Sequence, residues 1–339
     1  MNYIHLGLGK AHNLIEPNLL YREKLPKKGE NNMQLNTQPV VESNRGFQVW
    51  WQMTRPHTLT AAFVPVLLGT ALSLKHGNIH FGLFFAMLIA SLLIQAATNM
   101  FNEYFDFKRG LDTAQSVGIG GTIVRDGIKP KTVLNLAFGF YGIALLIGVY
   151  ICANSSWWLA VVGLICMTVG YFYTGGPLPI AYTPFGEIFA GFFMGMLIIL
   201  ISFFIQTGTV DLTSVLVSVP IMVLVGEILL ANNIRDLDGD KENGRRTVAI
   251  HLGKKRSIYL LAGMFTFSYL WVIGLIISGI APIWTAIVIL SIPKAIKATK
   301  GFIENSVPIQ MAPAMKATAQ TNTIFGFLLA IGIFVGHFL

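Results

Sequence analysis

Long apolar stretches alternate with short polar segments along most of this 339-residue chain. A helix needs about 20 apolar residues to cross a bilayer, and several stretches approach that length. We predict nine membrane-spanning helices, at about 57–75, 80–105, 132–152, 157–175, 187–206, 212–234, 257–278, 281–298 and 321–338. Pro293 and Lys294 interrupt the eighth of these segments. The pattern predicts an all-α membrane protein.

Composition agrees with this fold class, because 54% of the residues are hydrophobic and only 12% are charged. Soluble domains are about a quarter charged. Residues 1–48 are polar and mixed in charge, without the apolar core of a signal peptide. We therefore divide the chain into a polar cytoplasmic tail at 1–48 and a transmembrane domain at 49–339.

The basic residues predict how the chain lies in the membrane. With nine spans and a cytoplasmic N-terminus, every Lys and Arg except Lys75 falls on or beside the cytoplasmic side. This is the distribution that the positive-inside rule requires, and it places the C-terminus outside. It also explains the net charge of +8 without nucleic acid, since no zinc-finger, helix-turn-helix or RNA-binding signature accompanies the charge.

Two acidic clusters lie where predicted spans end, both on the cytoplasmic side. Carboxylates are costly at membrane depth and are functional candidates there. Within each cluster, oxygen-bearing side chains recur every four residues, which places them on one helix face. They are Asn102 and Asp106 after the second span, and Asn232, Asp236 and Asp240 after the sixth.

Oxygen ligands of this kind suit a hard cation. Mg²⁺ binds one or two carboxylates and completes its shell with water and substrate phosphates. We expect two Mg²⁺ ions, one per cluster, bridged by a diphosphate; Asp112 joins the five residues above as a candidate ligand. The histidines are scattered without metal-ligand spacing, which argues against zinc or iron.

Basic residues stand beside both clusters and are candidates to bind the diphosphate. These are Arg55, Lys108, Arg235 and Lys241. Their alternative role is ordinary positive-inside anchoring.

The clusters resemble the motifs of the UbiA superfamily of intramembrane aromatic prenyltransferases. Asn102 and Asp106 match the first motif, in which Gly110 stands at the third position and the acid follows at Asp112. Asp236 and Asp240 match the second motif completely. The spacing around Gly110 resembles the subfamily that prenylates 1,4-dihydroxy-2-naphthoate in menaquinone synthesis.

Further segments resemble the same subfamily, and the likeness extends from about residue 48 to the C-terminus. These segments are Arg55–Thr60, Gly120–Gly127, Tyr173–Tyr182 and Phe185–Glu187. The resemblance implies a bacterial cell-membrane enzyme with nine helices around a central cavity, open to the cytoplasm and to lipid.

The implied reaction moves a polyprenyl group from an all-trans polyprenyl diphosphate to 1,4-dihydroxy-2-naphthoate. Diphosphate and CO₂ leave, and demethylmenaquinone results. Asp106, Asp236 and Asp240 would be catalytic through the metal. Tyr173 would shield the allylic cation, because aromatic faces attract cations; alternatively, Tyr173 is an interface anchor.

Two alternatives stay open at this point. One keeps the fold and changes the acceptor to 4-hydroxybenzoate or haem. The other is a cation-coupled transporter, since intramembrane Asn and Asp also serve ion pathways. A transporter predicts polar residues near the midplane of the bilayer and an internal repeat, whereas the acids of this chain gather at one membrane edge.

Overall fold

The computed structural model describes residues 46–56, 58–112 and 121–339, and these ranges contain helices and loops but no strand. Residues Arg45–Leu339 make one compact unit. The all-α prediction is confirmed for these ranges, whereas the predicted tail lies outside the described residues up to residue 45.

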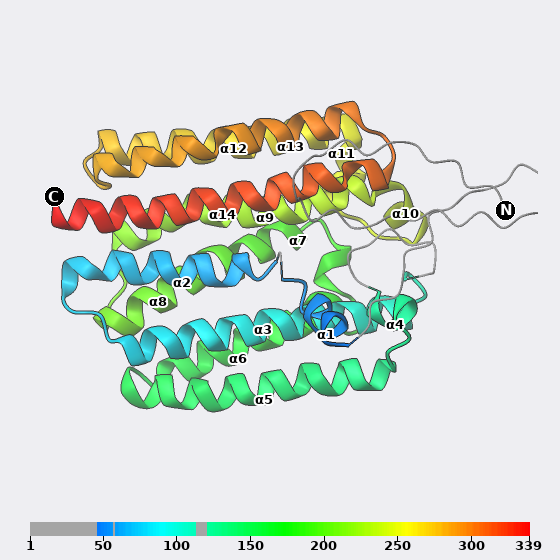
Figure 1. Cartoon of the computed structure of the whole chain (residues 1–339), viewed down its shortest axis with the longest axis horizontal. Coiled ribbons are helices and arrows are strands. Elements are labelled where there is room, and N and C mark those ends of the chain that lie inside the picture. Colours follow the sequence, from blue (N-terminus) through cyan, green and yellow to red (C-terminus); the bar gives the residue numbers. More distant parts are fainter. Residues whose placement is uncertain (1–45, 57, 113–120) are drawn as a thin grey trace, which may run out of the picture. The chain divides into compact units, whose positions relative to one another are not determined.

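The long helices of this unit lie roughly parallel in Figure 1. Six helical runs among the described residues are long and apolar enough to cross a membrane. They are α3 (Phe81–Lys108), α5 (Pro130–Asn154), the run Gly186–Thr207, α9 (Leu212–Arg235), α12 (Lys254–Ile277) and α14 (Pro308–Phe338). The run Gly186–Thr207 consists of α7 (Gly186–Ala190), the π-helical turn η3 (Gly191–Met196) and α8 (Leu197–Thr207).

Three predicted spans take other forms. Two are apolar but shorter, namely α2 (Thr60–Ser73) with its 3-10 extension η1 (Leu74–His76), and α6 (Trp158–Thr174). The third is split into a 3-10 run, η4 (Ile283–Ser291), and α13 (Ile292–Glu304), with Pro293 in the first turn of α13. Length and composition therefore support six spans, and the count of nine stays a prediction.

The last predicted span begins too late. The sequence places its start near 321, but α14 already begins at Pro308. Pro308 has the fixed backbone that suits the first helical position. Small residues such as Ala314 and Ala317 then bury against neighbouring helices, so packing extends the helix through a segment that is not uniformly apolar.

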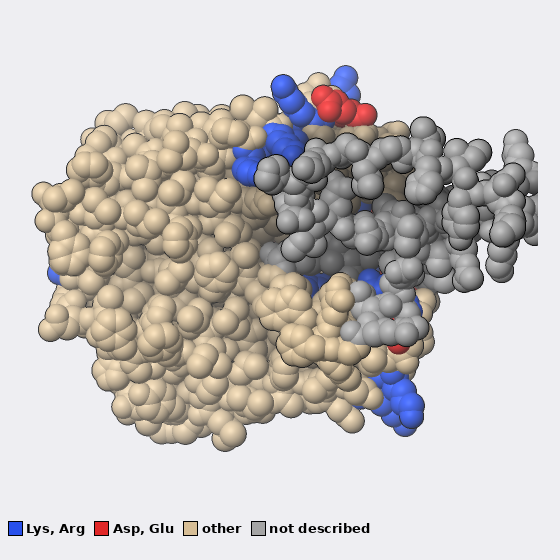
Figure 2. Space-filling model, viewed as in Figure 1, with Lys and Arg blue, Asp and Glu red and all other residues tan. Residues whose placement is uncertain are grey.

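Short helices gather at one end of the unit, opposite the C-terminus (Figure 1). They are α1 (Phe47–Met53), α4 (Thr122–Arg125), α10 (Leu237–Glu242) and α11 (Val248–Leu252). Lys and Arg gather at this same end in Figure 2, while the rest of the visible face is almost free of charge. This separation is the one expected of a protein that lies in a bilayer with one basic side.

Three buried apolar clusters build the described part of the unit. The largest joins α2, α8, α9, α12, α13 and α14. Another joins α3, α5 and α6, where Phe101 meets Tyr141 and Tyr171 edge-on at centroid distances of 5.1 and 5.2 Å. The third packs α3, α5 and α6 against α2 and α8. Away from these contacts a cavity is left between two helix groups, with α3, α5 and α6 on one side and α7–α9 on the other.

Close packing of α2 on α8 depends on Gly69. A Cβ atom at Gly69 would overlap the carbonyl oxygen of Ile199 and lie 2.7 Å from the Cβ of Ser202. Small residues at such contacts let membrane helices approach closely. Gly142 of α5 has no heavy atom within 4 Å of the corresponding position and makes no such contact.

We predict that Gly69→Ala lowers the melting temperature of the purified protein, because overpacking a tight contact costs ~1–3 kcal/mol. Gly142→Ala adds the same methyl group at an open position. This variant should have a melting temperature equal to or slightly above that of the wild type. The melting temperatures of both variants are measured by thermal unfolding in detergent. Equal melting temperatures for the two would contradict the packing described for α2 and α8.

Candidate active site

A cavity of about 800 Å³ runs between the two helix groups. Its end near the short helices is lined by the residues of both acidic clusters and by three arginines, Arg55, Arg235 and Arg245. The rest of its wall is mostly apolar and comes from α3, α5, α6, η3 and α8. The cavity is therefore polar at one end and apolar along its depth.

The first acidic cluster is shaped by the C-terminus of α3. Asn102 donates a hydrogen bond of 3.0 Å from Nδ2 to Oδ2 of Asp106, one helical turn later. Gly110 then adopts a left-handed conformation with φ 72°, and Leu111 N–H donates back to the carbonyl of Asp106 at 2.9 Å. This is the Schellman turn that glycine favours. The turn brings Asp112 back to the cavity, where it lines the wall.

The second acidic cluster spans the break between α9 and α10. Asp240 N–H still donates to the carbonyl of Asp236 at 2.8 Å, so the helical spacing persists across the break. Arg235 holds Asp236 by two hydrogen bonds of 2.6 and 2.5 Å. Asn232, Asp236 and Asp240 consequently all line the cavity, as their spacing predicts.

Arg245 joins the two clusters. Its Nη2 lies 3.2 Å from Oδ1 of Asp106, and its Nη1 lies 3.2 Å from Oδ1 of Asp240. Its guanidinium also lies over the ring of Tyr182, 4.6 Å from the centroid. Carboxylates that are more than 130 residues apart in sequence thus share one cation.

Burial dominates the electrostatics of the acids that lie outside the spanning helices. It raises the pKa of Asp240 to about 6, although Arg245 acts in the opposite direction. Burial, assisted by the charge of Asp106, likewise raises the pKa of Asp112 to about 6. Loss of hydration thus disfavours the ionised form of both carboxyls, and a bound cation would stabilise that form.

The basic residues proposed from the sequence separate into two pairs. Arg55 and Arg235 line the polar end of the cavity. Lys108 and Lys241 are exposed and lie off its wall. Arg109, which follows Lys108, has a structural role. It donates hydrogen bonds to the carbonyl oxygens of Thr174 and Gly176 at 2.5 and 2.9 Å, and these bonds hold the loop after α6 against α3.

The donor set fits a hard divalent cation. No group of three or more His, Cys, Asp or Glu side chains that could hold a metal ion by itself occurs among the described residues. The cavity wall nevertheless carries five aspartates against three arginines, and Oδ2 of Asp240 is buried without a hydrogen-bond partner. Carboxylates that supply only part of a coordination shell are typical of Mg²⁺ sites completed by water and phosphate.

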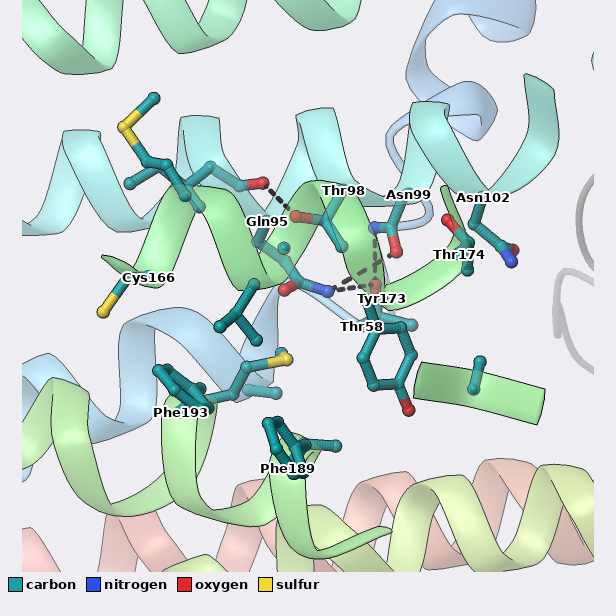
Figure 3. A pocket seen from close by; sticks show the side chains of 18 of the residues that line it. Thr58, Gln95, Thr98, Asn99, Asn102, Cys166, Tyr173, Thr174, Phe189 and Phe193 are labelled. Atoms are coloured by element: carbon teal, nitrogen blue, oxygen red, sulfur yellow. Dashed lines mark hydrogen bonds between the residues drawn. The ribbon is translucent and has the colours of Figure 1, made fainter. Parts of the chain in front are cut away.

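Aromatic rings line the cavity beyond its polar end. Figure 3 shows Tyr173 of α6 projecting into the cavity, with Phe189 and Phe193 opposite it on α7 and η3. The two phenylalanines stack with centroids 5.8 Å apart. Their spacing of four residues across the π-helical turn gave no signal in the sequence, because the whole segment is apolar.

A small polar network lies between the aromatic rings and the acidic end (Figure 3). Asn99 donates from Nδ2 to Oγ1 of Thr58 at 2.8 Å and to the carbonyl of Thr54 at 2.9 Å. Gln95 lies one turn deeper on α3 and also lines the cavity. These residues tie the loop before α2 to α3.

The cavity reaches the apolar flank of the unit. Leu145, Val149 and Leu164 line its wall and yet are exposed on the surface, at 44%, 53% and 54% of their area. They belong to α5 and α6. A ligand in the cavity can therefore extend an apolar tail toward the surface that lipid would cover.

Two buried carboxylates hold elements together through contacts that the sequence did not predict, although Glu187 belongs to a segment that carries the family resemblance. Glu103 accepts hydrogen bonds from Oγ1 of Thr122 and, at 2.9 Å, from N–H of Ile123, which anchors α4 to α3. Glu187 accepts from Nδ2 of the cavity residue Asn233 at 2.9 Å. Side chains of this kind could have been suspected only from the cost of burying a carboxylate.

Comparison with known proteins gives a consistent result. The family model described as "UbiA prenyltransferase family" matches residues 62–315. A protein of Bacillus subtilis (strain 168), named 1,4-dihydroxy-2-naphthoate octaprenyltransferase, is 60% identical over 291 residues, which cover 86% of this chain and 94% of the relative.

Solved structures share the fold. The apo structure of a UbiA homolog from Aeropyrum pernix K1 has a TM-score of 0.63 at 14% identity and covers 81% of this chain and 98% of its own. A UbiA homolog from Archaeoglobus fulgidus, solved with DMAPP and Mg²⁺, has a TM-score of 0.56 at 14% identity, covering 83% and 99%.

Proposed function

The chain belongs to the UbiA prenyltransferase family, and from this we propose that it transfers a polyprenyl group from an all-trans polyprenyl diphosphate to 1,4-dihydroxy-2-naphthoate. The observation that carries the proposal is the single cavity that joins an acidic, arginine-bearing end to an apolar interior. The relative that shares 60% of its residues is named for this acceptor.

The polar end of the cavity would bind the diphosphate. Two Mg²⁺ ions, when bound, supply the positive charge that stabilises the departing diphosphate. The oxygen ligands would come from both clusters, namely Asn102, Asp106, Asp112, Asn232, Asp236 and Asp240. Arg55 and Arg235, which line the same end, would donate to phosphate oxygens. Lys108 and Lys241 lie outside this wall and would act only at its rim.

The reaction replaces one bond of each substrate. The C1–O bond of the prenyl diphosphate breaks, and its electron pair leaves with the diphosphate. A ring carbon of the naphthoate forms the new bond to C1. The bond between the ring and its carboxylate then breaks, CO₂ leaves, and the electron pair returns to the ring. The product at this stage is demethylmenaquinol, and a separate two-electron oxidant, such as dissolved O₂, must accept its two electrons and two protons to give demethylmenaquinone.

Tyr173 would stabilise the positive charge that develops on the allyl group. Its ring faces the cavity beyond the acidic end, with Phe189 and Phe193 opposite (Figure 3). An aromatic face stabilises a nearby cation by ~0.5–2 kcal/mol. The phenolic oxygen lies 3.4 Å from the carbonyl of Gly186, which orients the ring.

We also propose a membrane arrangement for the chain. We place the acidic end of the cavity in the cytoplasm of a bacterial cell, because the basic residues gather at that end (Figure 2). The C-terminus, at the opposite end of the unit in Figure 1, would then lie outside. Nine spans, including the short α2 and α6 and the split η4–α13 segment, complete this topology.

We predict that the purified protein with Mg²⁺ joins a labelled polyprenyl diphosphate to 1,4-dihydroxy-2-naphthoate, with release of CO₂. An acceptor panel with 4-hydroxybenzoate and haem in the same assay should give little or no product. Preferred prenylation of another acceptor would refute the proposed substrate. Cation uptake into vesicles without any prenylated product would refute the enzyme itself.

We expect Asp236→Ala to reduce transfer by ~10²–10³-fold, because a lost electrostatic stabiliser of the leaving group has effects of that size. Glu242→Ala, which removes an exposed carboxylate of α10 outside the cavity wall, is the matched control. Size-exclusion profiles verify folding of both variants. Normal turnover by Asp236→Ala would remove that residue from the site.

Tyr173 offers a test of the aromatic ring apart from its hydroxyl. Tyr173→Phe should keep most of the transfer rate, whereas Tyr173→Leu should lose up to ~30-fold, in line with a cation–π contribution of at most ~2 kcal/mol. The single-turnover rates of the wild type and both variants are compared at saturating substrate. Equal rates for the two variants would show that the ring does not stabilise the developing cation.

A further inference from the structure

Arg245 occupies a central place at the polar end of the cavity. One guanidinium pairs with Asp106 of α3 and with Asp240 of α10, at 3.2 Å to each. These are the same carboxylates that would bind divalent cations. The guanidinium therefore occupies one oxygen of each carboxylate and competes with a metal ion for their negative charge.

The backbone that carries Arg245 is fixed independently of its side chain. Arg245 N–H donates to the carbonyl of Asp240 at 3.0 Å, and Arg246 N–H donates to the carbonyl of Tyr182 at 2.8 Å. Gly244, with φ 75°, makes the turn that leads into this segment. The long side chain of Arg245 can consequently swing from the carboxylates to a neighbouring ligand while its backbone stays in place.

The ion pair is not fully satisfied. Nε of Arg245 and Oδ2 of Asp240 are both buried without a hydrogen-bond partner. A purely structural buried ion pair stabilises a protein only when its remaining donors and acceptors are also bonded. One acceptor and one donor thus remain at the cavity wall, and they suit a metal ion and a phosphate oxygen respectively.

A divalent cation and the guanidinium cannot share these oxygens at low cost. Two positive charges ~4 Å apart repel strongly where water is partly excluded. A cation that binds the free Oδ2 of Asp240 would lie close to the guanidinium on Oδ1, and the repulsion favours movement of Arg245 away from the carboxylates. A diphosphate that arrives together with the cation gives the displaced guanidinium a new anionic partner.

We propose that Arg245 is a positioning residue that serves as an exchangeable counterion. It pairs with Asp106 and Asp240 until a divalent cation and a diphosphate bind together, and then it pairs with the diphosphate. The inference rests on the proposed function only in requiring a substrate that bears a diphosphate. It goes further by making metal and diphosphate binding mutually dependent.

The arginine side chain suits this exchange better than lysine. Its planar group presents five donors, so two can engage the carboxylates while Nε stays available. The ring of Tyr182, 4.6 Å from the guanidinium carbon, keeps the group near the site during the exchange. An enzyme built in this way binds little metal until its substrate is present.

The experiment measures Mn²⁺ binding from the loss of the free-ion EPR signal, with protein in lipid nanodiscs. Wild type should bind Mn²⁺ weakly alone and much more tightly with a non-reactive prenyl thiolodiphosphate. Arg245→Met should bind Mn²⁺ alone ~10-fold more tightly than wild type, and the gain on adding the diphosphate analogue should shrink by a similar factor, as coupling between sites requires.

Arg246→Met is the matched control, because it makes the same change at the next residue, whose side chain is exposed and lies off the cavity wall. It should leave the binding of Mn²⁺ alone at the wild-type level. A gain in Arg246→Met equal to that in Arg245→Met would show that the effect comes from net charge alone and would overturn the proposal.

Wild-type or weaker binding of Mn²⁺ by Arg245→Met would also overturn the proposal, since it would make Arg245 a structural support of the carboxylates. If Arg245→Met does not fold, Arg245→Lys serves instead, because its single ammonium cannot bridge both carboxylates and should release one of them. No acceptor is present in these measurements. A failure of the naphthoate assay would therefore leave the outcome for Arg245 unaffected.

Discussion

The pairing of Arg245 with Asp106 and Asp240 is the interaction on which the charge balance of the site depends. The two carboxylates lie on opposite sides of the cavity, Asp106 on α3 and Asp240 on α10. Apolar packing, which includes a cluster that joins α3, α5 and α6 to α2 and α8, sets where the helices run. It brings both acids to the end of the unit where charge is tolerated. There the guanidinium of Arg245 offsets part of their negative charge, and the acids with this shared counterion form the polar end of the cavity.

Local backbone chemistry gives each cluster its shape. Gly110 ends α3 in a left-handed turn, which glycine adopts without a steric cost, and the turn returns Asp112 to the cavity wall. The departure from the usual acidic motif is thus a change in how the third acid reaches the site. In the second cluster, Arg235 and Asp236 pair with each other, and the helical spacing continues across the break to Asp240.

The sequence predicts the spacing-dependent part of the site and leaves the rest undetermined. Helical period alone places Asn102 with Asp106 and Asn232 with Asp236 on common faces, and all four line the same cavity in the structure. Charge alone cannot rank the arginines and lysines, because a topogenic lysine and a ligand-binding arginine look alike in sequence. Lys108 and Lys241 therefore seemed as suitable as Arg55, whereas Arg245 acquires its importance only through a turn at Gly244.

The same limit applies to the fold. Apolar length predicts α3, α5 and α9 within a few residues, but it misplaces the start of α14, where burial of small side chains extends the helix beyond its apolar core. The eighth segment divides into η4 and α13 beside Pro293, where the sequence already predicts an interruption, but hydropathy does not show that its first half is a 3-10 helix.

The cavity has two different openings, and together they account for its chemistry. Its acidic end carries more aspartates than arginines, so a bare diphosphate is repelled there unless cations accompany it. Its apolar wall reaches the flank at Leu145 and Leu164, where an isoprenoid tail can remain among lipid chains. A substrate with a strongly charged head and a long apolar tail satisfies both ends at once. The aromatic rings of Tyr173 and Phe189 lie between them, where the bond from head to tail must break.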